Sequence, residues 1–352
     1  MHPQGAQEYY QTMNRCAVVI LNYNGADHLR RFLPSVIRHS KGEADVVVAD
    51  NGSTDNSIEI LHNEFAKDIQ ILQLPENFGF AEGYNVAARL LEPYGYSYYV
   101  LLNSDVEVEQ GWLTPLIETL DSESDVAAVA PKILSVNNPT HFEYAGASGG
   151  FIDYLGYPFC RGRILGTMEQ DKGQYDTPRE VFWASGAAFC CRADLFATMG
   201  GFCKEFFAHM EEIDLCWRMQ LAGWRIKVEP RSRVWHLGGG TLSTNSPRKL
   251  YLNHRNNLIM LFRCASPLQR LVVAVVRPAT DALAAVNYLA KGNVEGFKAV
   301  VRAWCDFLAA HSRLNRERKQ IRSSAKRESQ NIYKGIIVLR YALGQRRFKN
   351  MM

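Results

Sequence analysis

The first hundred residues alternate between short apolar runs and helical patterns, and this order constrains the fold more than any other feature. The apolar runs are 16–21, 45–49, 69–74 and 98–102. Because they lack polar alternation, they are typical of strands buried on both faces of a parallel sheet. Apolar residues at helical spacing fill the intervals, around 29–37, 58–65 and 86–91. We therefore predict a doubly wound α/β domain with a mostly parallel central sheet.

Polar segments follow three of these runs, at 22–25, 50–55 and 103–105. Since ligands of open parallel sheets bind at the carboxyl ends of strands, the segments are candidates for one site. Such residues also end strands and cap helices, and a capping role is favoured for Thr54 and Asp55. Asp50 and Asp105 directly follow buried runs, so their carboxylates need a polar partner or a metal ion.

The middle of the chain continues the α/β pattern around a less regular stretch. Helices are expected at 113–120, 194–199 and 212–222, and strands at 126–130, 224–228 and 233–235. The stretch 181–191 is apolar and is expected to return to the core. Residues 137–177 are rich in Gly, Pro, Tyr and Asp. This composition predicts loops and short strands that form an elaborated face.

Charge is distributed unevenly along the chain. Residues 1–247 hold 19 Lys and Arg against 31 Asp and Glu, whereas residues 248–352 hold 21 against 5. An acidic body with a basic tail indicates an anionic partner for the tail. No nucleic-acid reader motif accompanies the tail, so nucleic acid is not expected.

The tail carries amphipathic patterns at 268–289 and 297–308, followed by a basic run at 313–327. Arg277, Asp281 and Asn287 interrupt its longest apolar stretch, which falls short of the ~20 clean residues of a spanning helix. We therefore predict helices that lie on an anionic membrane surface. The alternative is that they pack on the preceding α/β domain or form a homodimer.

The expected domain division follows from these shifts: an N-terminal extension (1–14), an α/β domain (15–262) and a basic helical region (263–352). Residues 1–14 lack the charged start and apolar core of a secretory signal. None of the eight cysteines forms a CxxC pair, so a zinc ribbon is not expected and a reducing compartment is favoured. The predicted location is cytoplasmic, peripheral on the inner face of the cell membrane.

Seven motifs in order give the chain a specific resemblance. They are VVILNYNG, VVVADNGSTD, ENFGFAEGYNVA, LLNSDVEV, ASGAAFCCRADLF, GGFCKEFFAHMEEIDLCWR and VWHLGGGT, between residues 18 and 241. The set resembles family 2 glycosyltransferases, and within them bacterial enzymes that add rhamnose or similar sugars to cell-envelope glycans. The resemblance implies a GT-A fold and inverting transfer of a hexose from a dTDP-, UDP- or GDP-sugar to a hydroxyl of a glycan or lipid-linked acceptor.

The resemblance also implies a divalent metal site. Asp105 matches the last Asp of the family's Asp-x-Asp motif, and His236 matches its late His, which completes the metal or diphosphate site. A carboxylate with diphosphate oxygens suits Mg²⁺ or Mn²⁺. The metal would offset the charge of the leaving diphosphate.

The family's general base maps to Glu212, in a segment that resembles Glu-Asp-x-Asp. Here the usual Asp is replaced by Glu, one methylene longer, so Glu211 remains an alternative base. An inverting displacement needs one such base to take the acceptor's proton. Asp214 and Arg218 are four residues apart, and a helical salt bridge is the favoured role of this pair.

The nucleotide would lie at the ends of the first strands. The implied nucleotide-binding residues are Asn22, Asn24, Asp50, Asn77, Gly79, Gly83, Asn85 and Ser104. Asp50 is expected to bond the pyrimidine ring. Four of the others, Asn77, Gly79, Gly83 and Asn85, fit a plain turn and helix start equally well.

Two other functions compete with this interpretation. A dinucleotide-binding oxidoreductase is excluded because no GxGxxG follows the first strand. A non-catalytic nucleotide-sugar-binding scaffold remains the alternative. It is disfavoured because Asp105, Glu212 and His236 are all present.

Overall fold

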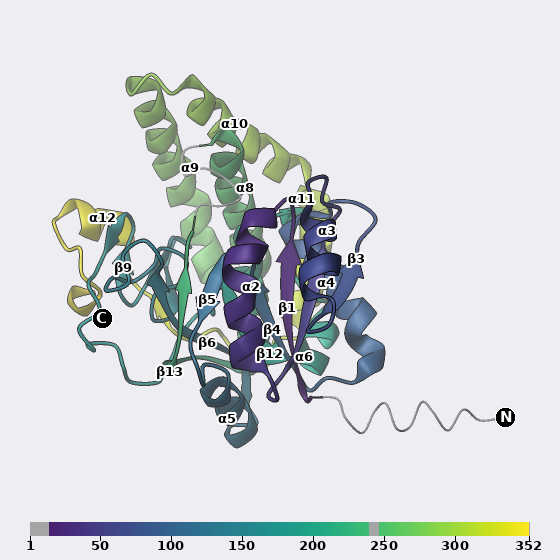
Figure 1. The fold of residues 1–352 in the computed structure, drawn as a ribbon. Coiled ribbons are helices and arrows are strands. Elements are labelled where there is room, and N and C mark those ends of the chain that lie inside the picture. Colours follow the sequence, from purple (N-terminus) through teal and green to yellow (C-terminus); the bar gives the residue numbers. More distant parts are fainter. Residues whose placement is uncertain (1–13, 239–245, 352) are drawn as a thin grey trace.

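The computed structural model describes residues 14–238 and 246–351. The four apolar runs of the first hundred residues form parallel strands, as predicted (Figure 1). β1 (Cys16–Asn22) lies between β2 (Asp45–Asp50) and β4 (Tyr98–Asn103), and β3 (Gln70–Gln73) extends the sheet beyond β2. The predicted limits of these strands are right to within one residue at nearly every end.

Helices cover both faces of this sheet. β1 alternates between the faces: Val18 packs with α2 (Ala26–Ser40) and α3 (Ser57–Ile60), and Val19 packs with α4 (Gly79–Leu91). A strand that is buried on both sides has no polar alternation, which explains its continuous apolar sequence.

The sheet continues on the other side of β4 with mixed strand directions. β12 (Ala188–Arg192) runs antiparallel to both β4 and β6 (Val126–Ser135), and β13 (Arg225–His236) runs parallel to β6. β13 therefore points the same way as β1, β2 and β4. The two strands predicted at 224–228 and 233–235 are one strand with a shift in register between Glu229 and Arg233. β5 (Val106–Val108) and β11 (Arg179–Glu180) pair with β13.

The stretch 137–177 contains a second, smaller sheet. Its strands are β7 (Gly150–Asp153), β8 (Pro158–Cys160), β9 (Arg163–Ile164) and β10 (Thr167–Met168). The fifth strand, β14 (Ile332–Tyr333), comes from the end of the chain and pairs with β7.

The C-terminal region is helical, as predicted. It comprises α8 (Pro247–Cys264), α9 (Pro267–Ala290), α10 (Val294–Ala309), α11 (His311–Ser323) and α12 (Ile337–Ala342). The expected boundary at 262 falls inside α8, and the last residues, including Phe348, join the main core. Of the expected N-terminal extension, only Asn14 lies within the described residues.

Candidate active site

Four strands of common direction end at one edge of the central sheet. The last residues of β1, β2, β4 and β13 are Asn22, Asp50, Asn103 and His236. The predicted convergence of the polar segments is therefore present, and β13 brings His236 to them from more than 130 positions along the chain.

Asp105 and His236 form a buried pair at this edge. His236 Nε2 lies 3.1 Å from Asp105 Oδ1, and its Nδ1 lies 3.1 Å from Glu143 Oε2. Gly238, with φ of +71°, passes so close that a Cβ there would stand 2.6 Å from Glu143 Oε1. Glu143 thus fixes the orientation of the imidazole, in the way that a carboxylate orients a metal-binding histidine.

The three groups shift one another's protonation. Burial lowers the pKa of His236, but its bonds to the two carboxylates outweigh this effect and raise the pKa to about 10. Burial likewise opposes ionisation of Asp105, yet His236 holds the pKa of that carboxyl below its usual value. The pair therefore carries opposite charges while no other cation is present.

The pair fits a divalent cation. A metal ion would replace the proton between His236 Nε2 and Asp105, because two ligands at right angles, each about 2.1 Å from Mg²⁺, stand about 3 Å apart, close to the observed 3.1 Å. Within the described residues, no group of three or more His, Cys, Asp and Glu side chains could hold a metal alone. A cation here would need further oxygen ligands from a bound anion, and a diphosphate supplies such oxygens.

Two adjacent carboxyl groups begin α7 (Glu211–Leu221). Burial raises the pKa of both Glu211 and Glu212, and the charge of Glu212 raises that of Glu211 further. In the described part of the chain, neither has a Lys or Arg within ion-pair distance, and each Oε2 is buried without a hydrogen bond. By contrast, Asp214 accepts from Arg218 Nε at 2.8 Å, which confirms the predicted salt bridge.

A short series of contacts connects the acidic start of α7 to Glu143. The Glu212 carboxyl lies beside Gly186, where a Cβ would be 3.7 Å from its carboxyl carbon. The neighbouring Ser185 hydroxyl donates to the Ala145 carbonyl, and the Ala145 amide donates to Glu143. Glu212, Glu143, Asp105, Glu211 and His236 therefore belong to one region, which we call the carboxyl-edge site.

The loop that leads into α7 has an unusual backbone. Phe207, His209 and Met210 all have φ between 62° and 73°, a conformation that is unfavourable for residues with a side chain. Asn256 of α8 donates through Nδ2 to three carbonyls of this loop, at 3.0 Å (Phe206), 2.9 Å (Ala208) and 2.8 Å (His209). Asn256 is fully buried and holds the loop in this conformation.

The residues expected to bind the nucleotide lie around β1 and β2. Asn22 donates to Asp50 at 2.9 Å, and Asp50 also accepts from the Ser53 amide at 2.9 Å. The Asn22 Oδ1 is buried without a partner. Asn24 accepts from the Thr54 amide at 2.7 Å, which joins the first two strand ends.

The second group of these residues supports the turn before α4. Asn77 accepts from the Gly79 amide at 2.8 Å, and Gly79, with φ of +78°, packs against the Phe207 ring. Gly83 packs against Leu21 and Asn51. The Asn85 side-chain amide donates to the Phe202 carbonyl and accepts from the Phe202 backbone amide. This favours a structural role for Asn85. Ser104 is half-buried in the turn between β4 and Asp105.

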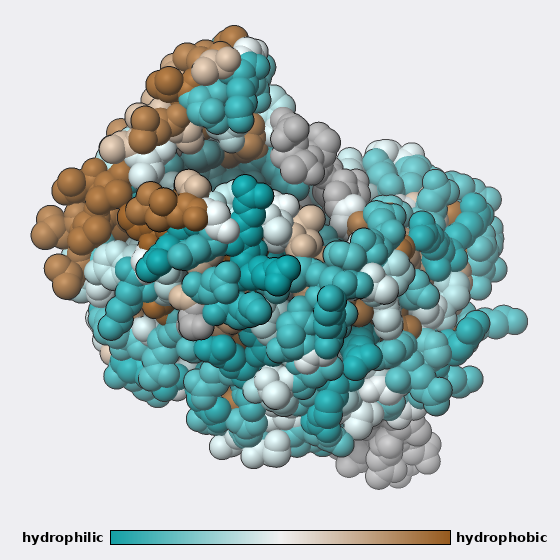
Figure 2. All heavy atoms as spheres, turned by 90° about the vertical axis from the view of Figure 1, so that its left-hand side faces the viewer, coloured by the Kyte–Doolittle hydropathy of each residue, from teal (hydrophilic) through white to brown (hydrophobic). Residues whose placement is uncertain are grey.

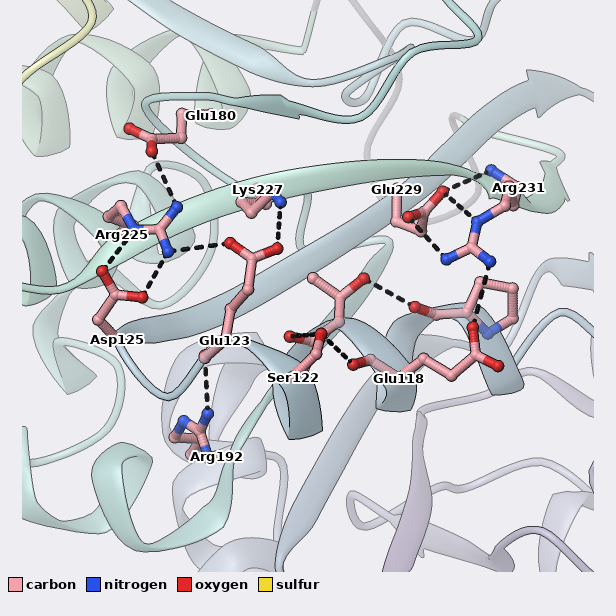
Figure 3. Close-up of polar contacts among 12 residues, drawn as sticks. Glu118, Ser122, Glu123, Asp125, Glu180, Arg192, Arg225, Lys227, Glu229 and Arg231 are labelled. Atoms are coloured by element: carbon pink, nitrogen blue, oxygen red, sulfur yellow. Dashed lines mark hydrogen bonds and ion pairs between the residues drawn. The ribbon is translucent and has the colours of Figure 1, made fainter.

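A surface hollow with many charged residues lies at the opposite edge of the sheet (Figure 3). It adjoins α5 (Thr114–Ser122) and the first half of β13. Each of its carboxylates meets a cation: Arg225 bonds Glu123 and Glu180 at 2.9 Å each, and Arg231 bonds Glu118 and Glu229 at 3.1 Å each. We call these residues, with Asp125 and Lys227, the amino-edge cluster. All of its charges except that of the buried Glu229 are partly exposed, and their pairing indicates a structural role.

Comparison with known proteins identifies the fold and the enzyme class. Residues 17–181 match the model of the family "Glycosyl transferase family 2". The chain carries a glycosyltransferase family 2 domain. A relative from Mycobacterium tuberculosis, N-acetylglucosaminyl-diphospho-decaprenol L-rhamnosyltransferase, is 26% identical over 259 residues, 69% of this chain and 83% of its own length.

Two further comparisons agree. The pre-mycofactocin glycosyltransferase of M. tuberculosis is 30% identical over 62% of this chain and 42% of its own length. TarS of S. aureus superimposes with a TM-score of 0.55 at 17% identity, covering 89% of this chain and 88% of that one. The expected GT-A fold and the expected enzyme class are confirmed, and this protein is a glycosyltransferase.

Sequence reasoning missed two residues of the candidate site. Glu143 lies in the stretch whose conformation could not be predicted, and a single Glu there carries no local signal. Asn256 lies in α8, where the sequence patterns did not predict a helix. The polar run 253–257, which directly precedes the apolar run 258–262, is the feature that could have drawn attention to it.

Proposed function

We propose that this glycosyltransferase transfers a hexose, such as rhamnose, from a nucleotide sugar to a hydroxyl group, with inversion at the anomeric carbon. One observation carries the proposal: the carboxyl-edge site joins a candidate cation site to the carboxyl pair Glu211 and Glu212, which has no basic partner among the described residues. The rhamnosyltransferase name of the M. tuberculosis relative supports the choice of sugar. A UDP-GlcNAc complex of TarS supports a nucleotide-sugar donor.

Glu212 is proposed as the general base. Its raised pKa makes it a stronger proton acceptor than an exposed carboxylate, provided that it is ionised when the acceptor arrives. Glu211 is only 4% exposed, whereas Glu212 is half-buried and more accessible to an acceptor. We therefore assign proton transfer to Glu212 and keep Glu211 as the alternative base.

Asp105 and His236 are proposed to hold Mg²⁺ or Mn²⁺ together with the donor diphosphate. When bound, the metal would stabilise the charge that builds up on the leaving diphosphate. Glu143 would keep His236 Nε2 directed at that position. The structure of GalNAc-T7 with UDP, GalNAc and Mn²⁺ has a related fold, with a TM-score of 0.59, and covers 86% of this chain and 59% of its own.

The nucleotide is proposed to lie along the ends of β1 and β2. The buried, unpartnered Oδ1 of Asn22 and the carboxylate of Asp50 are suited to donors on a base or ribose. Backbone at 24, 77–79 and 104 would border it, and Gly83 allows the helix to approach β1 closely.

The acceptor is proposed to be a glycan precursor linked to a lipid. The M. tuberculosis relative is named for a decaprenol-linked acceptor. Such an acceptor would place the enzyme at the inner face of the cell membrane, as a cytoplasmic peripheral protein.

The decisive experiment measures donor binding with and without metal. Wild-type protein is heated with dTDP-, UDP- or GDP-sugars in Mn²⁺ or in EDTA, because a bound ligand raises the melting temperature by mass action. We expect one nucleotide to stabilise the protein in Mn²⁺ only, and Asp105→Ala to abolish that stabilisation. Equal stabilisation in EDTA would overturn the metal assignment. Donor binding without any transfer activity would favour the scaffold alternative.

A further inference from the structure

The long helix α9 is oriented with its apolar residues outward. Its large exposed side chains are Leu268, Leu271, Val275, Leu283, Val286 and Leu289, and the exposed fraction of Val275 and Leu283 is 70% each. The charged residues Arg277 and Asp281 are only 1% exposed. This distribution is the reverse of that expected for a surface helix in water.

The buried charges of α9 are bonded to the protein. Arg277 donates to the Leu155 carbonyl at 2.9 Å and lies 3.2 Å from Asp281. Asp281 also accepts from Trp304 Nε1 at 3.1 Å. The residues that interrupt the apolar stretch in the sequence therefore leave the outer face of the helix unbroken.

The short helix α12 adds a second apolar face beside the first. Val338, Leu339 and Leu343 are 44%, 57% and 70% exposed. Figure 2 shows hydrophobic side chains gathered along the upper and left margins of this face of the molecule.

The two helices rest on the same turn, at 153–157. Gln269 of α9 donates to the Tyr154 carbonyl at 3.0 Å, and the Ile337 amide of α12 donates to Asp153 at 2.9 Å. We call the exposed apolar side chains of α9 and α12 together the apolar platform.

Exposed charges beside the apolar platform are basic. They are Arg270 and Lys291 at the ends of α9 and Arg340, Arg346 and Arg347 in and after α12. Residues 265–293 contain one acidic residue, the buried Asp281, and residues 334–349 contain none. An apolar surface with a basic rim complements an anionic bilayer.

The basic run at 313–327, by contrast, is largely used inside the protein. Arg318 donates to the Ala265 carbonyl at 2.7 Å and Arg327 to the Trp224 carbonyl at 2.7 Å, and Arg313 lies 2.7 Å from Glu317. In Figure 1, α11 lies on the other side of α8 from α9 and α12. For these residues the alternative of packing on the catalytic domain is the one observed.

We propose that the apolar platform docks the enzyme on an anionic lipid bilayer. α9 would lie within the headgroup region, its inner face still bonded to the protein. By length and composition α9 could also cross a membrane, but its buried ion pair ties it to the globular part. The role assigned to docking, access to a lipid-linked acceptor, rests on the proposed function, although the docking itself does not.

The test is co-sedimentation of the full-length protein with vesicles of phosphatidylcholine, with or without phosphatidylglycerol. We expect binding to the anionic vesicles. Leu283→Asp on α9 and Leu343→Asp on α12 should each lower the partition coefficient about tenfold. Leu90→Asp is the control, because Leu90 is a 47% exposed leucine on α4, outside the platform. Arg346→Gln should weaken binding about fivefold, and high salt should reduce this difference.

The outcomes distinguish docking from catalysis. Glu212→Gln should bind vesicles like wild type, so a failure of the proposed function would leave this result unchanged. Equal sedimentation of Leu283→Asp and Leu90→Asp, at equal melting temperatures, would overturn the proposal. So would a soluble dimer that dissociates on Leu283→Asp without any vesicle binding, because the platform would then be an interface between two copies of the chain.

Discussion

Carboxylates at the two edges of the central sheet differ in their ion pairing and burial. In the amino-edge cluster each carboxylate lies beside an arginine or lysine (Figure 3), and all but Glu229 are partly exposed. In the carboxyl-edge site the acids are buried, and Glu211 and Glu212 have raised pKa values. Partly exposed ion pairs contribute little to stability, whereas buried acids without basic partners are costly and are typical of functional sites. The difference indicates which edge is maintained for chemistry.

The variant Glu212→Gln is expected to have the largest effect and tests whether the carboxyl edge carries the chemistry. It removes a charge from the carboxyl-edge site with little change in shape. We expect transfer to fall by about 10²–10⁴-fold, since the amide cannot accept the acceptor's proton. Donor affinity should stay near that of wild type. Glu211→Gln is the matched control. If that variant loses turnover and Glu212→Gln keeps it, the base is Glu211.

The same carboxyl predicts a pH dependence. Burial raises the pKa of Glu212 to about 7, so the base is protonated and inactive below that pH. Turnover should fall about tenfold per pH unit below 7, and Glu212→Gln should lack this limb. A group whose pKa is raised on folding favours the folded state at low pH and loses that contribution as pH rises through 7. Glu212→Gln should therefore raise the melting temperature at pH 8.

A smaller effect is expected from the loop that presents the carboxyl pair. Asn256→Ala would leave three loop carbonyls without their donor and release a backbone with unfavourable φ values. We expect kcat to fall about ten- to a hundredfold through misplacement of Glu212, with donor affinity retained.

Gln269→Ala is the control for this variant. Gln269 lies on α9, and its buried side-chain amide donates to the Tyr154 carbonyl, so the substitution likewise removes an amide that bonds a backbone carbonyl. Both variants should be less stable than wild type. Only Asn256→Ala should also have a lower kcat and a shifted pH dependence of turnover below pH 7. Equal kcat in the two variants would contradict a positioning role.

The smallest effect is expected at the amino edge. Arg225→Gln removes the centre of the amino-edge cluster, and the unfolding free energy should fall by about 1 kcal/mol or less, with a smaller loss at high salt. Turnover should be unchanged. A large loss of turnover would mean that the two edges are coupled and that the contrast between them is wrong.

Sequence patterns predicted the parts of the fold that are built from local order. The apolar runs and helical spacings predicted β1, β2, β3 and β4. The motifs selected Asp105, His236 and the start of α7 as candidate site residues. The register shift within β13 made one strand look like two. The small sheet in 137–177 includes a pairing of β7 with β14. No local sequence pattern predicts a strand partner that lies so far along the chain.

The tail shows a different limit. Composition identified α9 as apolar but could not show that Arg277 and Asp281 face inward, because their partners come from the 155 turn and from α10. Likewise, a basic run in a sequence does not reveal that Arg318 and Arg327 bond carbonyls of other elements.

The pairing of β14 with β7 has a consequence for biosynthesis. Chains fold from the N-terminus as they are made, and distant pairings form late. The strands β1 to β4 can assemble while the ribosome is still making the tail, but the small sheet beyond the Glu143 loop cannot be completed until residue 333 has emerged. Until the segment 332–333 is available to pair with β7, a nascent chain would thus hold the assembled strands β1 to β4 beside an incomplete small sheet.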